Sequence, residues 1–331
     1  MNRLDRMLPA LVISALAFTL AGCTIAAPAA RPSAAPSATI DPANPVTVKN
    51  CGTAVTFAAA PKRVVTIKST STEMLLALGL GNRIVGTAYQ DGPVPDEWAS
   101  DAANLPSIAD KVPSEEVVLG KQPDLIYSGW ESAFTPDAAG ARDELAGLGV
   151  ETYVSPSACQ THDQPKKLTF DNIFGDITQV ASIFRVDPST LLSSQKAALK
   201  AIKPDGQGRT AFWYSSGSDT PYAGAGIGAP ELVMQTAGLK NIAANVDATW
   251  APYNWESVVA ADPDFIVLID ASWSTVAKKM AVLQNNPATA NLTAVKNGRF
   301  IILPFASSEA GVRSVEAVKS VVDQINDLDG K

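Results

Sequence analysis

Short apolar, β-branched runs alternate along the chain with stretches whose apolar residues recur at helical spacing. The first run, RVVTI from Arg63 to Ile67, precedes a helical stretch in which Thr70 and Glu73 have capping-box spacing and Gly79 marks the end. Further strand candidates are RIVGTAY, DLIYSGW, VETYVS, TAFWYSS, DFIVLID and RFIILPF. Strands separated by helices predict an α/β fold with mainly parallel central sheets, whose ligand sites lie at the carboxyl ends of the strands.

The middle of the chain has a purely helical pattern. Apolar residues from Phe170 to Phe184 recur as in an amphipathic helix, and a second helix is expected after Asp187-Pro188. Turn residues in KPDGQGR follow. We therefore expect two lobes and a connection, with bounds of 46–165 for the N-terminal lobe, 166–205 for the inter-lobe helical segment and 206–331 for the C-terminal lobe.

Each lobe contains one copy of a unit that leads from an acidic residue to a strand. Glu116 stands seven residues before Pro123-Asp124, and Glu256 stands seven residues before Pro263-Asp264. Each glutamate is expected in the first turn of a short helix that the Pro-Asp pair turns into a strand. On the residues alone, either glutamate could do no more than complement its helix dipole.

Composition narrows the classes of function. The 331 residues are 46% hydrophobic and 18% charged, which is ordinary for a globular protein. A net charge of −7 leaves no basic patch for nucleic acid, and a single histidine, His162, argues against a histidine-rich metal site. The sequence has no Gly-x-Ser-x-Gly elbow, so a surface-anchored hydrolase is the weaker alternative.

The N-terminus has the pattern of an export signal. Two arginines precede an apolar run from Leu8 to Leu20, and the run ends in LAGC. This resembles the bacterial lipobox, in which cleavage before Cys23 is accompanied by diacylation of its thiol. Residues 1–22 are then a lipoprotein signal peptide, and residues 23–45 are the lipid anchor and an Ala/Pro/Ser tether. An ordinary secretory cleavage site is the alternative; lipidation would hold the domain on the outer face of the cytoplasmic membrane.

The other two cysteines fit the same compartment. With Cys23 acylated, Cys51 and Cys159 remain as a pair where a disulfide is permitted. Two separate buried thiols are the alternative. A disulfide closing a loop of roughly a hundred residues would stabilise the fold by about 4 to 5 kcal/mol in the chain-entropy model.

Several segments, in order and spacing, are similar to the class III substrate-binding proteins of ABC importers, which carry iron-siderophores, haem and cobalamin. They span about residues 46 to 331 and read RVVTIKSTSTEMLLALGLGNRIVGTA, EEVVLGKQPDLI, LGVETYV, ESVVAADPDFIVL, AVKNGRFIILP and GVRSVEAVKSVVDQI. The resemblance implies a monomer without catalytic activity, metal or cofactor, whose two lobes are joined by a long rigid helix and hold ligand between them. It also implies that Glu116 and Glu256 dock into arginine pockets on the permease dimer.

The loops after the strands should converge on such a cleft, and they are rich in aromatic rings with polar neighbours. We expect ligand contacts from Tyr89, Asp91, Trp130, Glu131, Trp213, Tyr214, Tyr222, Trp250, Tyr253, Trp273 and Phe305. Such residues suit a flat, conjugated or chelated ligand, and Lys68 and Arg313 could meet an anionic group. Some of the rings could instead belong to the core, and Arg313 could pair with a carboxylate of its own lobe.

Ligand identity rests on a narrower resemblance. The stretches NCGTAVTF, AYQDGPVP, YSGWESAF and TYVSPSAC are similar to an actinobacterial subgroup proposed to bind a coenzyme F(420) precursor, a deazaflavin with a phospholactate group. A ferric siderophore would use the same aromatic and charged residues. Cobalamin and haem complete the set of candidate ligands, and haem is disfavoured if His162 lies outside the cleft.

Overall fold

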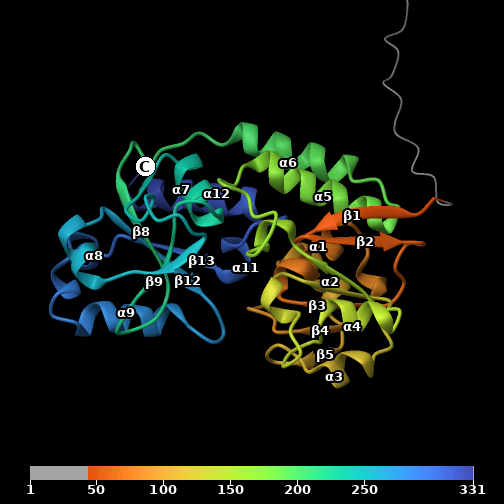
Figure 1. The fold of residues 1–331 in the computed structure, drawn as a ribbon. Coiled ribbons are helices and arrows are strands. Elements are labelled where there is room, and N and C mark those ends of the chain that lie inside the picture. The colour runs from red at the N-terminus through yellow and green to blue at the C-terminus, as the bar shows by residue number, and fades with distance from the viewer. Residues whose placement is uncertain (1–43, 331) are drawn as a thin grey trace, which may run out of the picture. The chain divides into compact units, whose positions relative to one another are not determined.

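The computed structural model describes residues 44–330, which contain two lobes, each built on a mainly parallel central sheet (Figure 1). The expected signal peptide, Cys23 and all but the last two residues of the expected tether lie outside the described residues. Within residues 44–330, no helix is both long and apolar enough to cross a bilayer.

The N-terminal lobe is built on five parallel strands in the order β5-β4-β3-β6-β7. Their bounds are β3 (Val64–Ile67), β4 (Ile84–Ala88), β5 (Ser107–Ala109), β6 (Leu125–Ser128) and β7 (Glu151–Val154). The helices of this lobe are α1 (Ser69–Ala77), α2 (Ala99–Ala102), α3 (Glu115–Leu119) and α4 (Arg142–Gly147). The parallel order confirms the α/β fold that the alternating pattern predicts.

An antiparallel hairpin of β1 (Val46–Asn50) and β2 (Thr53–Phe57) precedes that sheet. Its two turn residues, Cys51 and Gly52, have φ angles of 48° and 79°. Positive φ at both central positions is what a tight two-residue hairpin turn requires. The alternation of strands and helices did not predict this hairpin.

The C-terminal lobe has a mixed six-stranded sheet in which β12 lies between β8 and β13, all three parallel. The strands are β8 (Thr210–Ser216), β9 (Tyr222–Gly224), β10 (Lys240–Asn241), β11 (Trp250–Pro252), β12 (Phe265–Asp270) and β13 (Phe300–Pro304). The helices are α7 (Ala229–Thr236), α8 (Trp255–Ala261), α9 (Val276–Asn285), α10 (Thr293–Lys296), α11 (Phe305–Ser308) and α12 (Ser314–Leu328).

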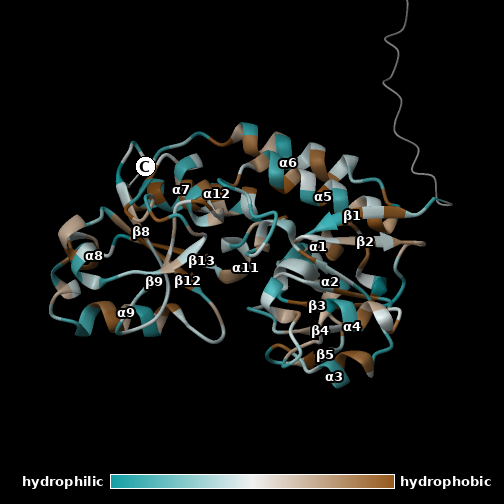
Figure 2. Ribbon diagram, viewed as in Figure 1, coloured by the Kyte–Doolittle hydropathy of each residue, from teal (hydrophilic) through white to brown (hydrophobic). Residues whose placement is uncertain are grey.

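Two helices, α5 (Phe170–Phe184) and α6 (Ser189–Ala201), connect the lobes where the hydrophobic pattern predicts them. Thr169 and Asn172 form a capping box at the start of α5, and Arg185 ends it in a left-handed conformation. The connection is therefore two helices, whereas the family resemblance implied one long helix. Figure 2 shows apolar and polar segments alternating along both, as expected for amphipathic helices.

The central strands of both sheets are buried on both faces, which explains their nearly continuous apolar sequences. In β12, Phe265, Val267 and Ile269 pack into one cluster, while Ile266 and Leu268 pack into the cluster on the opposite face. The cluster beneath α5 also contains Val312 and Val315, which flank the start of α12. The core is thus continuous between the lobes on the side of the connecting helices.

Candidate functional site

A cavity of about 550 Å³ lies between the lobes, within the size range of small-molecule sites. The N-terminal lobe lines it with Tyr89, Trp130, Ser132, Gln160 and Gln164. The C-terminal lobe lines it with Ser215, Ser216, Tyr222, Asp247, Ala248, Thr249, Trp250, Trp273, Phe305 and Glu309. Tyr89, Trp130 and Phe305 follow β4, β6 and β13, so the cavity forms where parallel strands end.

Aromatic rings form most of the apolar wall, and Phe305 is central to them. Its ring is edge-on to Trp130 and Trp273, with centroids 6.2 and 5.1 Å away, and nearly parallel to Trp250 at 6.3 Å. Tyr89 packs edge-on against Trp130 at 5.4 Å. With Tyr222, these are the six aromatic residues from the expected ligand contacts that line the cavity.

Lys68 lies behind this wall and is completely buried. Its ammonium group bonds the Asp91 carboxylate and lies 4.0, 4.4 and 4.6 Å from the ring centroids of Trp130, Tyr89 and Phe305. Gly129 permits this close packing, because a Cβ there would lie 2.3 Å from Thr70 Oγ1 and 2.9 Å from Lys68 Cβ. Lys68 and Asp91 therefore support the rings from behind. The sequence led us to expect both side chains in the cavity wall, and neither lines the cavity.

Glu309 ties the lobes together at the cavity. This buried carboxylate of the C-terminal lobe accepts hydrogen bonds from the Trp130 indole N–H and from the Thr70 hydroxyl, both in the N-terminal lobe. Burial raises the pKa of Glu309, and the charge of Lys68 opposes that rise. Glu309 was not among the expected site residues.

Arg313 faces a different part of the lobe junction. Its guanidinium lies 3.5 Å from Glu73 and 2.9 Å from Glu316, and it lines a second cavity together with Asp91. Burial raises the pKa of Glu73 from 4.5 to about 8, although Arg313 acts in the opposite direction. Arg313 thus forms ion pairs with two carboxylates, Glu73 and Glu316. Its side chain does not line the aromatic cavity.

Three expected contacts lie in the core. Trp213 and Tyr214 are buried on opposite faces of β8, and only the last two residues of that strand, Ser215 and Ser216, reach the cavity. Tyr253 packs against Phe212 and donates its hydroxyl proton to the Ile242 carbonyl. The prediction that Trp213 and Tyr214 contact ligand was wrong because both lie inside β8, two or more residues before its end.

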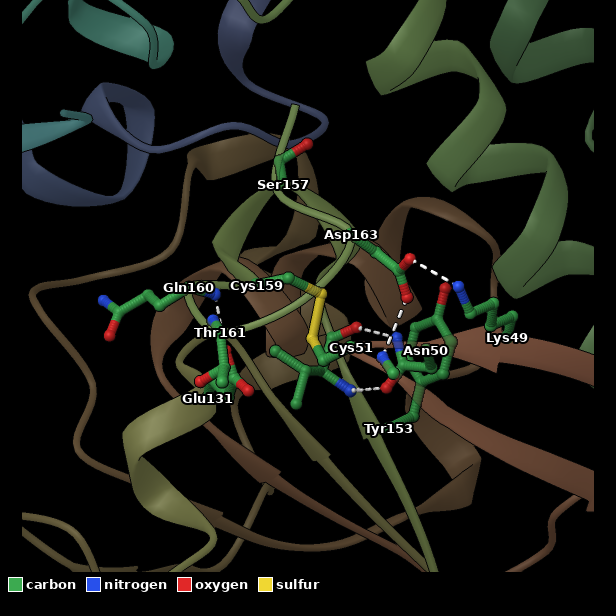
Figure 3. The surroundings of a disulfide bond; sticks show 12 residues. Lys49, Asn50, Cys51, Glu131, Tyr153, Ser157, Cys159, Gln160, Thr161 and Asp163 are labelled. Carbon is green, nitrogen blue, oxygen red and sulfur yellow. Dashed lines mark hydrogen bonds and ion pairs between the residues drawn. A yellow bond between two sulfur atoms is a disulfide. The ribbon is translucent and has the colours of Figure 1, made fainter. Parts of the chain in front are cut away.

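A disulfide fastens one wall segment of the cavity to the hairpin (Figure 3). Cys51 and Cys159 are joined with an S–S distance of 1.96 Å and a Cα–Cα distance of 5.2 Å. Glu131 accepts hydrogen bonds from the backbone N–H groups of Gln160 and Thr161, so it anchors the wall rather than lining the cavity.

Asp163 fastens the same segment to the hairpin at a second point. Its carboxylate accepts hydrogen bonds from Gly52 N and Lys49 Nζ, each 2.8 Å long. His162 Cδ2 would lie 2.7 Å from a Cβ on Gly52, and His162 is not among the residues that line the cavity.

The polar part of the cavity wall was missed from the sequence. It consists of Ser132, Gln160, Gln164, Ser215, Ser216, Asp247, Thr249 and Glu309. Their positions carry a usable signal only at Ser215 and Ser216, which end a strand. Ser132 lies in a single 3-10 turn and the others lie outside helices and strands, so no periodic pattern identifies the direction of these side chains.

Glu116 and Glu256 lie on equivalent elements of the two lobes. Each is exposed in the first turn of its helix, α3 or α8. Ser114 caps α3 by accepting from Val117 N, and Asn254 caps α8 by accepting from Ser257 N. Neither glutamate lines the cavity.

The described residues contain no group of three or more histidine, cysteine or acidic side chains placed to hold a metal ion. The cavity between the lobes is the candidate site.

This chain is similar in sequence to known transport proteins. The Periplasmic binding protein family matches residues 64–306. The uncharacterized ABC transporter substrate-binding lipoprotein YvrC of Bacillus subtilis is 23% identical over 283 residues, covering 85% of each chain. A cobalamin-binding protein of Halobacterium salinarum is 26% identical over 303 residues, covering 86% of this chain and 77% of that protein.

A solved structure supports the same placement. It is described as an ABC-type Fe3+-hydroxamate transport system from Saccharomonospora viridis, and the match has a TM-score of 0.74 at 25% identity. The match covers 87% of this chain and 99% of that one. Because the family match also spans most of the sequence, the chain belongs to the periplasmic binding protein family, a non-enzymatic component of transport systems.

Proposed function

We propose that this protein is the ligand-capturing component of an ABC importer and takes up a small conjugated or chelated molecule. The proposal rests on the aromatic cavity between the lobes, which both lobes line with polar side chains. In this proposal Cys23 holds the protein on the outer face of the cytoplasmic membrane by its lipid. Glu116 and Glu256 dock the monomer on the permease dimer.

The charge of the cavity favours a ferric siderophore of the hydroxamate type among the candidate ligands. None of the described residues that line the cavity is lysine, arginine or histidine. The phosphate of a phospholactate group would therefore find no cation in this wall, whereas a ferric trihydroxamate core has no net charge to neutralise. The solved Fe3+-hydroxamate transport protein is similar over almost its whole length, which supports the same choice.

The deazaflavin precursor is the second candidate, and one observation favours it. Trp250 and Phe305 are nearly parallel, with 12° between their planes, and both line the cavity. A planar heterocycle could stack on either ring. For haem, the described lining residues offer no imidazole, and Tyr89 and Tyr222 are the side chains among them that could ligate its iron.

Tryptophan fluorescence can test the proposal directly, because Trp130, Trp250 and Trp273 line the cavity. A protein of residues 44–330 would be titrated with a ferric trihydroxamate, the phospholactate deazaflavin, haem and cobalamin. We expect saturable quenching by the ferric trihydroxamate at micromolar concentration or below. Quenching by the deazaflavin alone, after inner-filter correction, would instead establish the narrower resemblance, and no saturable quenching by any of the four would refute the ligand class.

A further inference from the structure

The exposed part of the cavity wall carries one charged side chain. The exposed lining residues, defined here as the rim, are Ser132, Gln160, Gln164, Tyr222, Asp247 and Trp273. Asp247 lies in the segment between β10 and β11 and makes no hydrogen bond or ion pair with any residue that the structure describes. Its carboxylate is therefore available to a ligand.

The other acidic group in the wall is already engaged. Both oxygens of Glu309 accept hydrogen bonds from the opposite lobe, so this carboxylate has a structural task. The nearby cations are compensated as well, because Lys68 bonds Asp91 and Arg313 lies between Glu73 and Glu316. Within the described wall of the cavity, nothing offsets the charge of Asp247.

Two aromatic rings on the rim add a second feature that attracts cations. Tyr222 and Trp273 are 41% and 39% exposed, which is unusual for large aromatic side chains, and both line the cavity with Asp247. The face of an aromatic ring attracts ammonium and guanidinium groups through its quadrupole. A rim that carries a carboxylate and exposed rings around one cavity is suited to an organic cation and unsuited to an anion.

We propose that the rim recognises a positively charged arm of the ligand, an ammonium or guanidinium, through the Asp247 carboxylate and the rings of Tyr222 and Trp273. This inference rests on the proposed function and specifies its ligand. The ligand's chelated or conjugated body packs on the aromatic wall, and its charged arm lies at the rim.

A series of ligands that differ only in terminal charge tests the inference. Ferrioxamine B, a ferric trihydroxamate with a free amine, would be compared with its N-acetyl and N-succinyl derivatives, which end in a neutral group and a carboxylate. In the unmodified protein we expect the Kd to rise from amine to acetyl to succinyl, by roughly two- to fivefold at each step, the scale of an exposed charge pair. The preference for the amine should weaken as salt increases.

Asp247→Asn supplies the residue-specific test, with Asp219→Asn as its matched control. Asp219 is exposed in the same lobe but does not line the cavity. Asp247→Asn should bring the amine and acetyl ligands to nearly equal Kd and leave the Kd of the acetyl ligand within about twofold. Asp219→Asn should leave the ratio between the two ligands unchanged.

The experiments distinguish failure of the charge inference from failure of the trihydroxamate proposal. Equal Kd for the three ligands in the unmodified protein, or an unchanged ratio in Asp247→Asn, would overturn the charge inference and leave the ferric trihydroxamate as ligand. Failure of all three to bind would overturn the trihydroxamate proposal and the inference that rests on it.

Discussion

Glu73 illustrates how a buried carboxyl group links stability to pH. Its side chain is only 1% exposed, and burial raises its pKa to about 8 although Arg313 lies 3.5 Å away. The folded state therefore holds a proton that the unfolded chain, with a pKa near 4.5, releases at lower pH. The stability contributed by this protonated group is fully present below about pH 4.5 and is lost as the pH rises through about 8.

Glu73→Gln should consequently reduce the fall in unfolding free energy between pH 5 and pH 8. The amide imitates the protonated carboxyl group and needs no proton to remain buried. Urea unfolding at the two pH values would measure the change, with Glu144→Gln as control because Glu144 is exposed and is not among the groups that shift the pKa of Glu73. An equal fall in both variants and in the unmodified protein would refute this assignment.

At the same scale, the sequence predicted the aromatic wall better than the polar wall. Tyr89, Trp130 and Phe305 could be found because each directly follows a strand. Trp213 and Tyr214 were misplaced because a ring inside a strand looks the same in sequence as a ring at its end. Lys68 was misplaced for another reason: burial beside Asp91 is a tertiary contact that no local pattern reveals.

The segment from Cys159 to Gln164 shows how a stretch of chain without regular structure is held in place. The disulfide, Glu131 and Asp163 fasten it to the N-terminal lobe, and the Gln164 amide reaches the Thr249 hydroxyl of the other lobe at 3.3 Å. This segment also carries two residues of the cavity wall, Gln160 and Gln164. Its order should therefore affect both stability and ligand binding.

Replacing both Cys51 and Cys159 by serine should lower the unfolding free energy by about 2 to 5 kcal/mol, the usual effect of losing a disulfide. The backbone amides of the segment should exchange hydrogen faster, and ligand Kd should rise because part of the cavity wall is less ordered. Mass spectrometry of the non-reduced protein supplies the control by showing the linked peptides. Free thiols at both positions in the unmodified protein would show that loss of a disulfide cannot explain these changes.

Hydrophobic patterning was most informative for the elements that bury apolar faces. The apolar spacing of α5 follows from burial of one stripe of that helix. The β-branched runs of the central strands follow from burial on both faces of the mainly parallel sheets. The hairpin of β1 and β2 was missed because each strand has only five residues and buries only two of them. The division between α5 and α6 was visible in the pattern, and only the family resemblance suggested a single helix.

For the whole molecule, the two equivalent glutamates suggest recognition by a partner with two-fold symmetry. Glu116→Ala combined with Glu256→Ala should abolish uptake in cells and leave the ligand Kd unchanged, because both carboxylates are exposed and lie outside the cavity. Glu144→Ala combined with Asp219→Ala removes two other exposed charges and should leave uptake intact. A parallel loss of ligand affinity in the first pair would show that the glutamates serve the cavity instead.

The hydrogen bonds between the lobes determine how readily the lobes separate. Glu309 bonds Thr70 and Trp130, and Asp91 accepts from the Trp273 indole N–H at 3.4 Å. Spreading the lobes breaks these bonds in a largely dry environment, where each is costly to lose. Separation of the lobes should therefore be rare, so the cavity keeps its shape while a molecule enters or leaves across the exposed rim.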